Sequence, residues 1–151
     1  MTVTFEDLSV GDRDSFGAYA VTEEEMREFA DAYDPQWFHT DPERAASESI
    51  YGELVASGWH TAAMTMRMLV EYHLADAAAL GALGVDDLRW PAPVFAGETL
   101  SVETEVIDRR RSESDPSRGV VEIFVRTAND ADETKMEMTA IVLYASRRGR
   151  D

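Results

Sequence analysis

The chain has 151 residues, of which 44% are hydrophobic, so it is long enough to bury the core of one domain. Thirty acidic residues against fourteen basic ones give a formal net charge of −16, which argues against general binding to the phosphate backbone of DNA or RNA. Cysteine is absent, so there is neither a disulfide framework nor a thiolate site. We interpret the acidity as a solvated surface that high salt would screen, and a specific cationic partner is the alternative.

The N-terminal part of the chain predicts a cytoplasmic protein that begins with a strand and an acidic helix. The first residues lack the basic and apolar regions of a secretory signal. Residues 14–20 form a plausible strand after a short lead-in. Thr22 to Glu25 has the pattern of a capping box, and apolar residues follow it at helical spacing. Pro35 disfavours the helical conformation at Asp34, so we expect the helix to end there.

The next loop holds an acid and an imidazole, Asp34 and His39, separated by four residues that include Trp37 and Phe38. On a constrained loop the two groups can converge on one water molecule and act as general base and acid. The alternative is that Asp34 stops the helix and His39 is structural, because such spacings also occur by chance. After the loop, Asp41 followed by proline predicts another short helix.

The longest apolar run, residues 57–74, predicts a core helix that opens at Ser57, a plausible cap. Nearly every face of this helix is apolar, so we expect it to be buried, and charged residues interrupt it too often for a membrane span. Its N-terminus at Gly58 offers free N–H groups and a positive dipole end, which suit a developing oxyanion. The alternative is that Gly58 only allows close packing of the backbone.

The remainder of the chain predicts four strands. The Gly-Ala-Leu-Gly run at 81–84 is expected to form a turn, and alternating apolar residues predict a half-buried strand at 99–107. Charged loops are expected between the later strands. A strand, short helices, one long helix and four further strands together predict an α+β fold in which one antiparallel sheet curls around one helix. The expected strands are 85–90, 99–107, 120–127 and 136–146.

Taken in this order, the features resemble the MaoC-like dehydratases, the (R)-specific enoyl-CoA hydratase group of the hot dog fold. The resemblance rests on a Tyr-Asp helix end, on His-Thr-Asp-Pro at 39–42, on Ala-Ser-Gly-Trp-His-Thr at 56–61 and on Leu-Arg-Trp-Pro-Ala-Pro-Val-Phe-Ala-Gly-Glu at 88–98. It implies a single hot dog domain over residues 1–151. The family's catalytic acid/base positions fall on Asp34 and His39, and its oxyanion-hole glycine falls on Gly58.

The activity implied by the resemblance is the reversible syn addition of water to a trans-2-enoyl-CoA, or dehydration of the 3-hydroxyacyl-CoA in the reverse direction. The CoA thioester is the substrate, and no separate cofactor is expected. The implied partner is a second copy of the chain, as a homodimer or a dimer of dimers, with neither nucleic acid nor membrane. Three histidines in the chain form no recognised metal-ligand spacing.

The commonest family pattern has asparagine and then proline two and three positions after the aspartate, whereas here Pro35 follows Asp34 directly and Gln36 replaces the asparagine. Trp37 is the bulky residue that comes next. We expect Gln36, Trp37, Trp59 and His60 to contact the substrate. For His60, the alternative is a structural role. Two arginine clusters are candidates for CoA phosphate contacts, with a solvated loop and tail as the alternative: Arg109, Arg110 and Arg111 with Arg118, and Arg147, Arg148 and Arg150.

Two other functions remain open at this point. A hot dog thioesterase usually needs a carboxylate on or near the long helix, and the one acid inside this helix, Glu71, is placed to pair with Arg67 instead. A non-catalytic acyl-CoA-binding subunit is the other alternative, in which Asp34 and His39 merely hold the loop.

Overall fold

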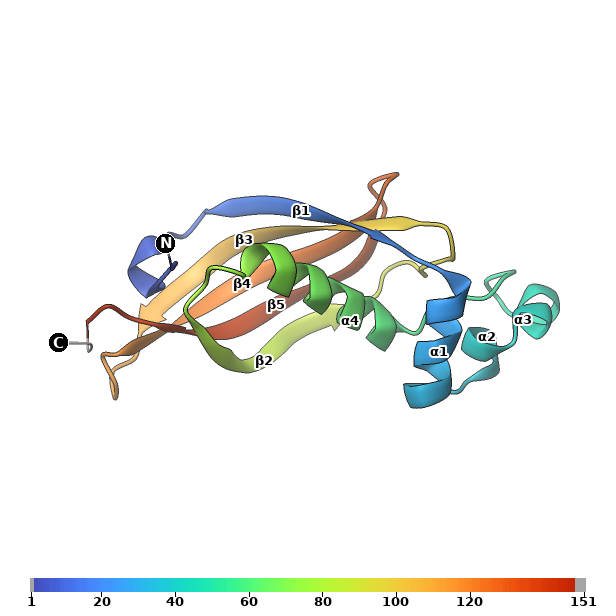
Figure 1. Cartoon of the computed structure of the whole chain (residues 1–151), viewed down its shortest axis with the longest axis horizontal. Coiled ribbons are helices and arrows are strands. Elements are labelled where there is room, and N and C mark those ends of the chain that lie inside the picture. Colours follow the sequence, from blue (N-terminus) through green and yellow to red (C-terminus); the bar gives the residue numbers. More distant parts are fainter. Residues whose placement is uncertain (1, 149–151) are drawn as a thin grey trace.

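In a computed structural model, which describes residues 2–148, a five-stranded antiparallel sheet curls around one helix, α4 (Figure 1). The strands lie in the order β1-β3-β4-β5-β2, so β1 and β2 form the two edges. This is the expected α+β architecture. The elements are η1 (Phe5–Asp7), β1 (Arg13–Ala20), α1 (Glu23–Tyr33), α2 (Trp37–Thr40), α3 (Pro42–Glu48), α4 (Gly58–Met68), η2 (Leu69–His73), β2 (Ala79–Arg89), β3 (Thr99–Arg111), β4 (Arg118–Asn129) and β5 (Thr134–Ala145).

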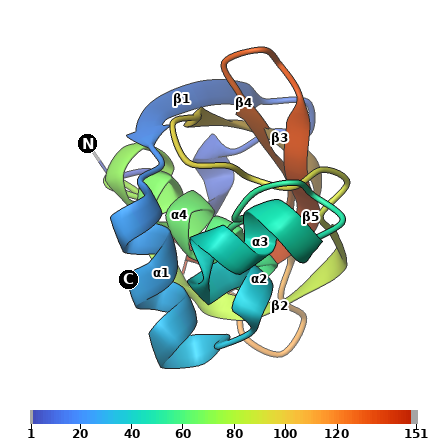
Figure 2. The same cartoon turned by 90° about the vertical axis from the view of Figure 1, so that its right-hand side faces the viewer.

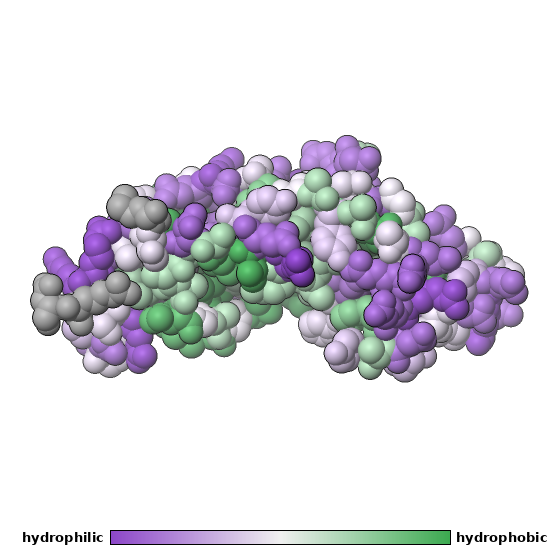
Figure 3. Space-filling model, viewed as in Figure 1, coloured by the Kyte–Doolittle hydropathy of each residue, from purple (hydrophilic) through white to green (hydrophobic). Residues whose placement is uncertain are grey.

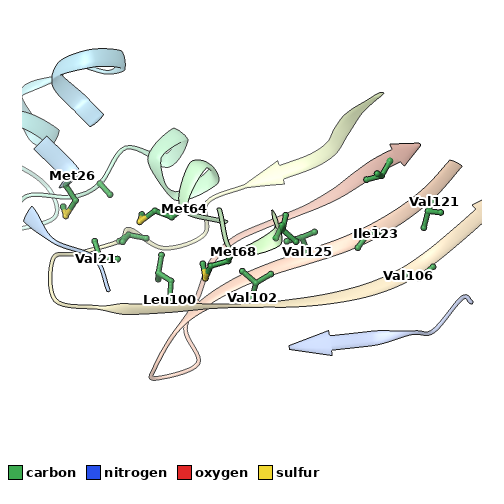
Figure 4. Packing of buried hydrophobic residues seen from close by; sticks show 14 of the residues in the cluster. Val21, Met26, Met64, Met68, Leu100, Val102, Val106, Val121, Ile123 and Val125 are labelled. Carbon is green, nitrogen blue, oxygen red and sulfur yellow. The ribbon is translucent and has the colours of Figure 1, made fainter. Parts of the chain in front are cut away.

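The inner face of the sheet forms one wall of the core, as the alternation in the sequence predicts. On β3 the side chains of Leu100, Val102, Thr104 and Val106 are buried, whereas those between them are more exposed. Successive side chains of a strand point to opposite faces, so a period of two places one set against the helix. Figure 4 shows how Val102, Val125 and their neighbours gather around Met68 of the central helix.

The central helix is only partly covered, which corrects the expectation that all its faces are buried. Met64 and Met68 are buried against the sheet, but Trp59, Met66 and Val70 are between 48% and 59% exposed. The sheet curls around one side of a helix only, so the opposite side stays uncovered in a single chain. No helix within residues 2–148 combines the length and the hydropathy that crossing a bilayer requires.

Three helices lie at the end of the molecule where α4 begins, and Figure 2 shows α1, α2 and α3 grouped there, with α1 in contact with α4. The Thr22 side chain accepts a hydrogen bond from the Glu25 N–H and caps α1, and α1 ends at Asp34 as predicted. Asp41 caps α3 through the Arg44 N–H. The one-turn helix α2 lies where the sequence predicted only a loop. This arrangement brings the residues after α1 next to the start of α4.

The predicted turn at 81–84 is wrong, because these residues belong to β2. Gly81 and Gly84 have φ values of 147° and 159°, and the pairing of β2 with β5 shifts register at both glycines. Such bulges keep the strand in the sheet while they bend it, and glycine accommodates them without a Cβ penalty. A Gly-rich run that looks like a turn is therefore a bent edge strand.

A buried lysine holds the loop that connects β2 to β3. Lys135 is the chain's single lysine, and its side chain is 1% exposed. Its ammonium donates to the Pro93 carbonyl at 2.7 Å and lies 3.0 Å from the Glu98 carboxylate, which also accepts from the Phe95 N–H. On the other side of this loop, the Ala56 N–H donates to the Val94 carbonyl. The loop is thus fixed on two sides next to the start of α4.

Candidate active site

Asp34 and His39 converge at the junction of α1 and α2. Asp34 is the C-cap of α1 and His39 lies within α2, and the Asp34 Oδ2 and His39 Nε2 atoms are 3.3 Å apart. The other ring nitrogen, Nδ1, lies 2.7 Å from the Val55 carbonyl oxygen. A carbonyl only accepts hydrogen bonds, so we assign a proton to Nδ1, which leaves Nε2 free to exchange a proton with Asp34 or with a ligand.

Two side-chain donors fix the Asp34 carboxylate. The Ser57 hydroxyl donates to Oδ2 at 2.7 Å, and the Gln36 amide donates to Oδ1 at 2.7 Å. Burial by itself raises the pKa of Asp34, but these two hydrogen bonds and the neighbouring His39 outweigh it, so the net pKa lies below the ordinary value. Asp34 is therefore an oriented carboxylate at neutral pH.

Gly58 and His39 border the same cavity, which has a volume of about 390 Å³. Gly58 is the first residue of α4, and the first N–H groups of a helix have no partner within it. Among residues 2–148 its N–H has no hydrogen-bond acceptor. The remaining lining is mostly apolar: Phe38, Tyr51, Val55, Ala56, Thr61, Trp90, Pro91, Ala92, Pro93 and Val94.

Gly58 also leaves no room for a side chain. A Cβ built on it would lie 2.6 Å from two ring carbons of Trp90. Both interpretations of this glycine therefore apply at once, because it permits close packing and presents a free N–H at a helix N-terminus. Such a donor in a mostly apolar cavity can bind a carbonyl oxygen that gains negative charge.

Ser57 links the two halves of the site, which the sequence interpretation missed. Its side chain caps α4 by accepting from the Trp59 N–H, and the same hydroxyl donates to Asp34. The sequence marked Ser57 only as a cap, and the 22 residues between it and Asp34 gave no signal that the two would meet. Trp90 was likewise not predicted to lie against Gly58.

The four residues that were expected to contact substrate lie in different places. Gln36 holds Asp34, and the Trp37 ring lies under the Arg44 guanidinium, 4.3 Å from its carbon. Trp59 is exposed and meets Trp90 edge-on at 5.1 Å between ring centroids. The structure therefore brings together Asp34, His39 and Gly58, with Gln36 behind them, and leaves Trp37 and Trp59 outside the cavity lining.

His60 lies apart from Asp34 and His39, beside Glu25 and Phe29 of α1. Its Nε2 atom is 3.4 Å from a Glu25 carboxylate oxygen, and its ring stacks on Phe29 at 4.8 Å between centroids. Burial lowers the pKa of His60, although Glu25 acts in the opposite direction. His60 therefore does not join the cavity that His39 lines.

Three of the arginines considered for phosphate binding contact the far end of the sheet, and Arg150 lies outside the described residues. Arg109 donates to the Phe5 and Leu8 carbonyls, and Arg111 and Arg147 bond side chains of the N-terminal segment. Figure 1 places this segment at the opposite end of the molecule from α1. These contacts favour a structural role for the three arginines. In the described part of the chain, no three His, Asp or Glu side chains are grouped so that they could hold a metal ion.

Comparison with known proteins agrees with this geometry. The family model described as "MaoC like domain" matches residues 10–129. A 3-hydroxyacyl-thioester dehydratase Z from Mycobacterium tuberculosis is 32% identical over 114 residues, which are 74% of this chain and 72% of that protein. The crystal structure of a MaoC-like dehydratase from Rhodospirillum rubrum is 39% identical, with a TM-score of 0.85 over 96% of this chain and 98% of that one.

A third similarity shows the fold alone. Rv0216 from Mycobacterium tuberculosis, described as a double hotdog fold, is 15% identical with a TM-score of 0.81, over 99% of this chain and 46% of that one. The predicted hot dog fold is therefore confirmed. With a family model that covers most of its length and a solved MaoC-like structure that is 39% identical over 96% of the chain, this chain belongs to the MaoC-like dehydratase family.

Proposed function

We propose that this protein adds water reversibly to the double bond of a trans-2-enoyl-CoA and gives the (R)-3-hydroxyacyl-CoA. The observation that carries the proposal is the single cavity that His39, beside Asp34, shares with the free N–H of Gly58. An enoyl thioester needs these two elements, a proton-transferring pair beside its double bond and a donor at its carbonyl oxygen. Similarity to a 3-hydroxyacyl-thioester dehydratase supports the same reaction class.

In the proposed mechanism, Asp34 and His39 handle the protons of one water molecule. As the water oxygen bonds to C3, its proton passes to the pair at the His39 Nε2 atom or the Asp34 Oδ2 atom. The pair then delivers one proton to C2, so water is consumed and the protein ends in its starting state. Both steps occur on the face of the double bond that meets the pair, which gives syn addition.

The electrons of the double bond move toward the thioester oxygen during this step. The oxygen gains its charge only as the reaction proceeds, so a donor fixed in place beforehand stabilises the transition state more than the substrate. We assign this role to the Gly58 N–H and the positive end of α4. The buried Ser57 hydroxyl keeps Asp34 ionised and aligned with the helix that carries this donor.

Substrate contacts in this proposal come from the aromatic wall of the cavity. Trp90 lies against Gly58, and Trp59 meets Trp90 at a more exposed position. In this proposal Trp59 contacts the part of the substrate that lies outside the cavity. We assign Gln36 to Asp34 and not to the acyl chain. A thioesterase mechanism through Glu71 is less favourable, because its carboxylate already pairs with Arg67 at the surface.

The test is hydration of crotonyl-CoA and of longer and branched enoyl-CoAs, followed by loss of the conjugated ultraviolet absorbance. We expect Asp34→Asn and His39→Ala each to lower kcat by about a hundredfold or more, with little change in the melting temperature. Asp31→Asn is the matched control, since Asp31 is an exposed carboxylate on the same helix and should leave kcat unchanged.

The proposal fails if folded wild-type protein hydrates none of these substrates. Release of free thiol from acyl-CoA would then identify a thioesterase, and binding without turnover would identify an acyl-CoA-binding subunit. Equal losses of stability and activity in the two variants would give Asp34 and His39 a structural role instead.

We also propose that the active form is a homodimer. β2 is an edge strand, and Figure 3 shows hydrophobic surface over β2 and the adjoining side of α4, whereas α1 to α3 are hydrophilic. An uncovered apolar face of this kind marks an interaction site. Its large exposed side chains are Trp59, Met66, Val70, Leu80, Leu83 and Val85.

Light scattering after size exclusion tests the oligomeric state. We expect a mass of two chains for the wild type and of one chain for Leu80→Asp, with Val10→Asp as the control at an exposed apolar residue on the N-terminal segment. A wild-type mass of one chain under conditions where the enzyme is active would contradict the dimer.

A further inference from the structure

A second polar cluster joins three elements at the far side of α4 from the cavity. The Glu25 carboxylate of α1 accepts a hydrogen bond from the Tyr19 hydroxyl of β1 and lies 3.4 Å from the His60 Nε2 atom of α4. The capping-box pattern predicts that this glutamate would reach back to the start of its own helix. Its carboxylate instead contacts the two neighbouring elements.

The cluster contains a buried polar atom that destabilises the fold, which argues against a role in stability alone. The His60 side chain is 4% exposed, and its Nδ1 atom has no hydrogen-bond partner among residues 2–148. Burial, then the hydrogen bond to Glu25, raises the pKa of Tyr19 to about 12, so Tyr19 is a neutral hydrogen-bond donor to Glu25. A buried polar atom without a partner destabilises the fold, so an apolar side chain at this position would be less costly.

The helices that this cluster joins are not closely packed along their length. An open cleft of about 730 Å³ lies between α1 and α4, and Glu28, Phe29 and Tyr33 of α1 line it opposite Ala63 and Arg67 of α4. A helix beside such a cleft lacks the continuous side-chain contacts that fix most helix pairs. The buried Met26 and Ala30 and the stacking of Phe29 on His60 hold the inner side of α1, and polar contacts near its two ends add to them.

Two polar contacts fix the ends of α1 to the first turn of α4. At the start of α1, Glu25 meets His60, and at its C-cap, Asp34 accepts from the Ser57 hydroxyl. His60 and Ser57 are three residues apart on α4, so both contacts use the same turn. Movement at the first contact is therefore transmitted along α1 to the catalytic carboxylate.

We infer that Glu25 is a positioning residue, which sets α1 through Tyr19 and His60 and thereby holds Asp34 against His39 and Gly58. The inference rests on the proposed function, in which Asp34 carries out proton transfer. A displacement of about 1 Å in a catalytic group far from the mutation can cost on the order of a hundredfold in rate.

The first test compares turnover in three variants. We expect Glu25→Ala to lower kcat by about 10- to 100-fold with KM within about twofold of the wild type. Glu25→Gln should restore most of kcat, because its amide oxygen can take the place of the carboxylate oxygen that faces both Tyr19 and His60. Glu28→Ala removes an exposed carboxylate from the same cleft and should match the wild type.

The second test does not depend on activity, so it separates this inference from the proposed function. The chain has three histidines, and the His39 imidazole resonances report on the neighbouring Asp34. We expect these resonances to shift in Glu25→Ala and to stay in place in Glu28→Ala. If Glu25→Ala does not fold, Tyr19→Phe removes only the hydroxyl that bonds Glu25 and should shift them as well.

Three outcomes would overturn the inference. One is a Glu25→Ala variant with wild-type kcat and unmoved His39 resonances. The second is an equal loss of kcat in Glu25→Gln and Glu25→Ala. The third is a loss of kcat in Glu28→Ala as large as that in Glu25→Ala, which would indicate a general effect of charge in the cleft.

Discussion

Removal of the Ser57 hydroxyl is the most informative single change, because this group connects the N-terminus of α4 to the Asp34 carboxylate. Ser57→Ala deletes a hydrogen bond of 2.7 Å to Asp34 and the side-chain cap of α4. The serine is fully buried, so water does not replace the lost donor without rearrangement. We expect a smaller rate, a lower stability and a changed pH profile.

The structure sets the expected magnitudes. A hydrogen bond to a charged group contributes about 1.5–3 kcal/mol, and the loss of a helix cap costs about 1 kcal/mol. The free energy of unfolding should therefore fall by about 2–4 kcal/mol. If the transition state loses the whole contribution of the hydrogen bond from Ser57 to Asp34, kcat/KM falls by about 10- to 100-fold, since about 1.4 kcal/mol corresponds to a factor of ten.

The pH dependence has a definite sign. The Ser57 hydrogen bond favours the ionised form of Asp34 and helps to keep its pKa below the ordinary value. Without it the carboxyl group takes up a proton at higher pH, so the acid limb of kcat/KM moves upward. A lowered native pKa stabilises the fold above the unfolded pKa and ceases to do so as acid protonates the native group. The stability difference between wild type and variant is therefore largest at neutral pH and shrinks in acid.

The assay is hydration of crotonyl-CoA between pH 4 and pH 9, combined with thermal melts at the same pH values. Ser47→Ala is the matched control, because this exposed α3 hydroxyl donates only to backbone carbonyls. A Ser57→Ala enzyme with kcat/KM within about twofold of the wild type and an unmoved acid limb would refute the role assigned to the hydroxyl.

Three further predictions follow from packing and charge. Gly58→Ala forces a methyl group against Trp90, so we expect a loss of about 1–3 kcal/mol in melts and a change in tryptophan fluorescence, both relieved by a second change, Trp90→Leu. Lys135→Met leaves Glu98 without its buried partner and should cost about 3–5 kcal/mol in denaturant unfolding, whereas little change would show that water reaches the carboxylate. Molar KCl should raise the melting temperature, because it screens the repulsion of a net charge of −16, and an unchanged melting temperature would contradict this explanation.

The sequence predicted an element of this fold well where a single local signal, such as hydrophobic alternation or a proline, determines the structure. The alternation from Leu100 to Val106 identified β3 and its buried face, and Pro35 identified the end of α1. The failures occurred where the tertiary structure used a residue in an unusual way. Gly81 and Gly84 look like a turn in sequence, but pairing with β5 converts them into bulges of an edge strand.

The candidate site shows the same division between local and long-range information. Asp34 and His39 are five positions apart, so a constrained loop was enough to bring them together. The contacts from Ser57 to Asp34 and from His60 to Glu25 span 23 and 35 residues, and only the packing of α1 on α4 creates them. A serine in a helix cap and a histidine in an apolar helix carry no sequence mark of such partners.

The buried lysine gives this protein a built-in chemical reporter. All surface side-chain cations among the described residues are arginine or histidine, because the one lysine of the chain, Lys135, lies under the loop that walls the cavity. An amine-reactive reagent can therefore modify a lysine only when that loop opens or the chain unfolds. The rate of modification under native conditions measures how often the cavity wall detaches, and substrate that occupies the cavity should slow it.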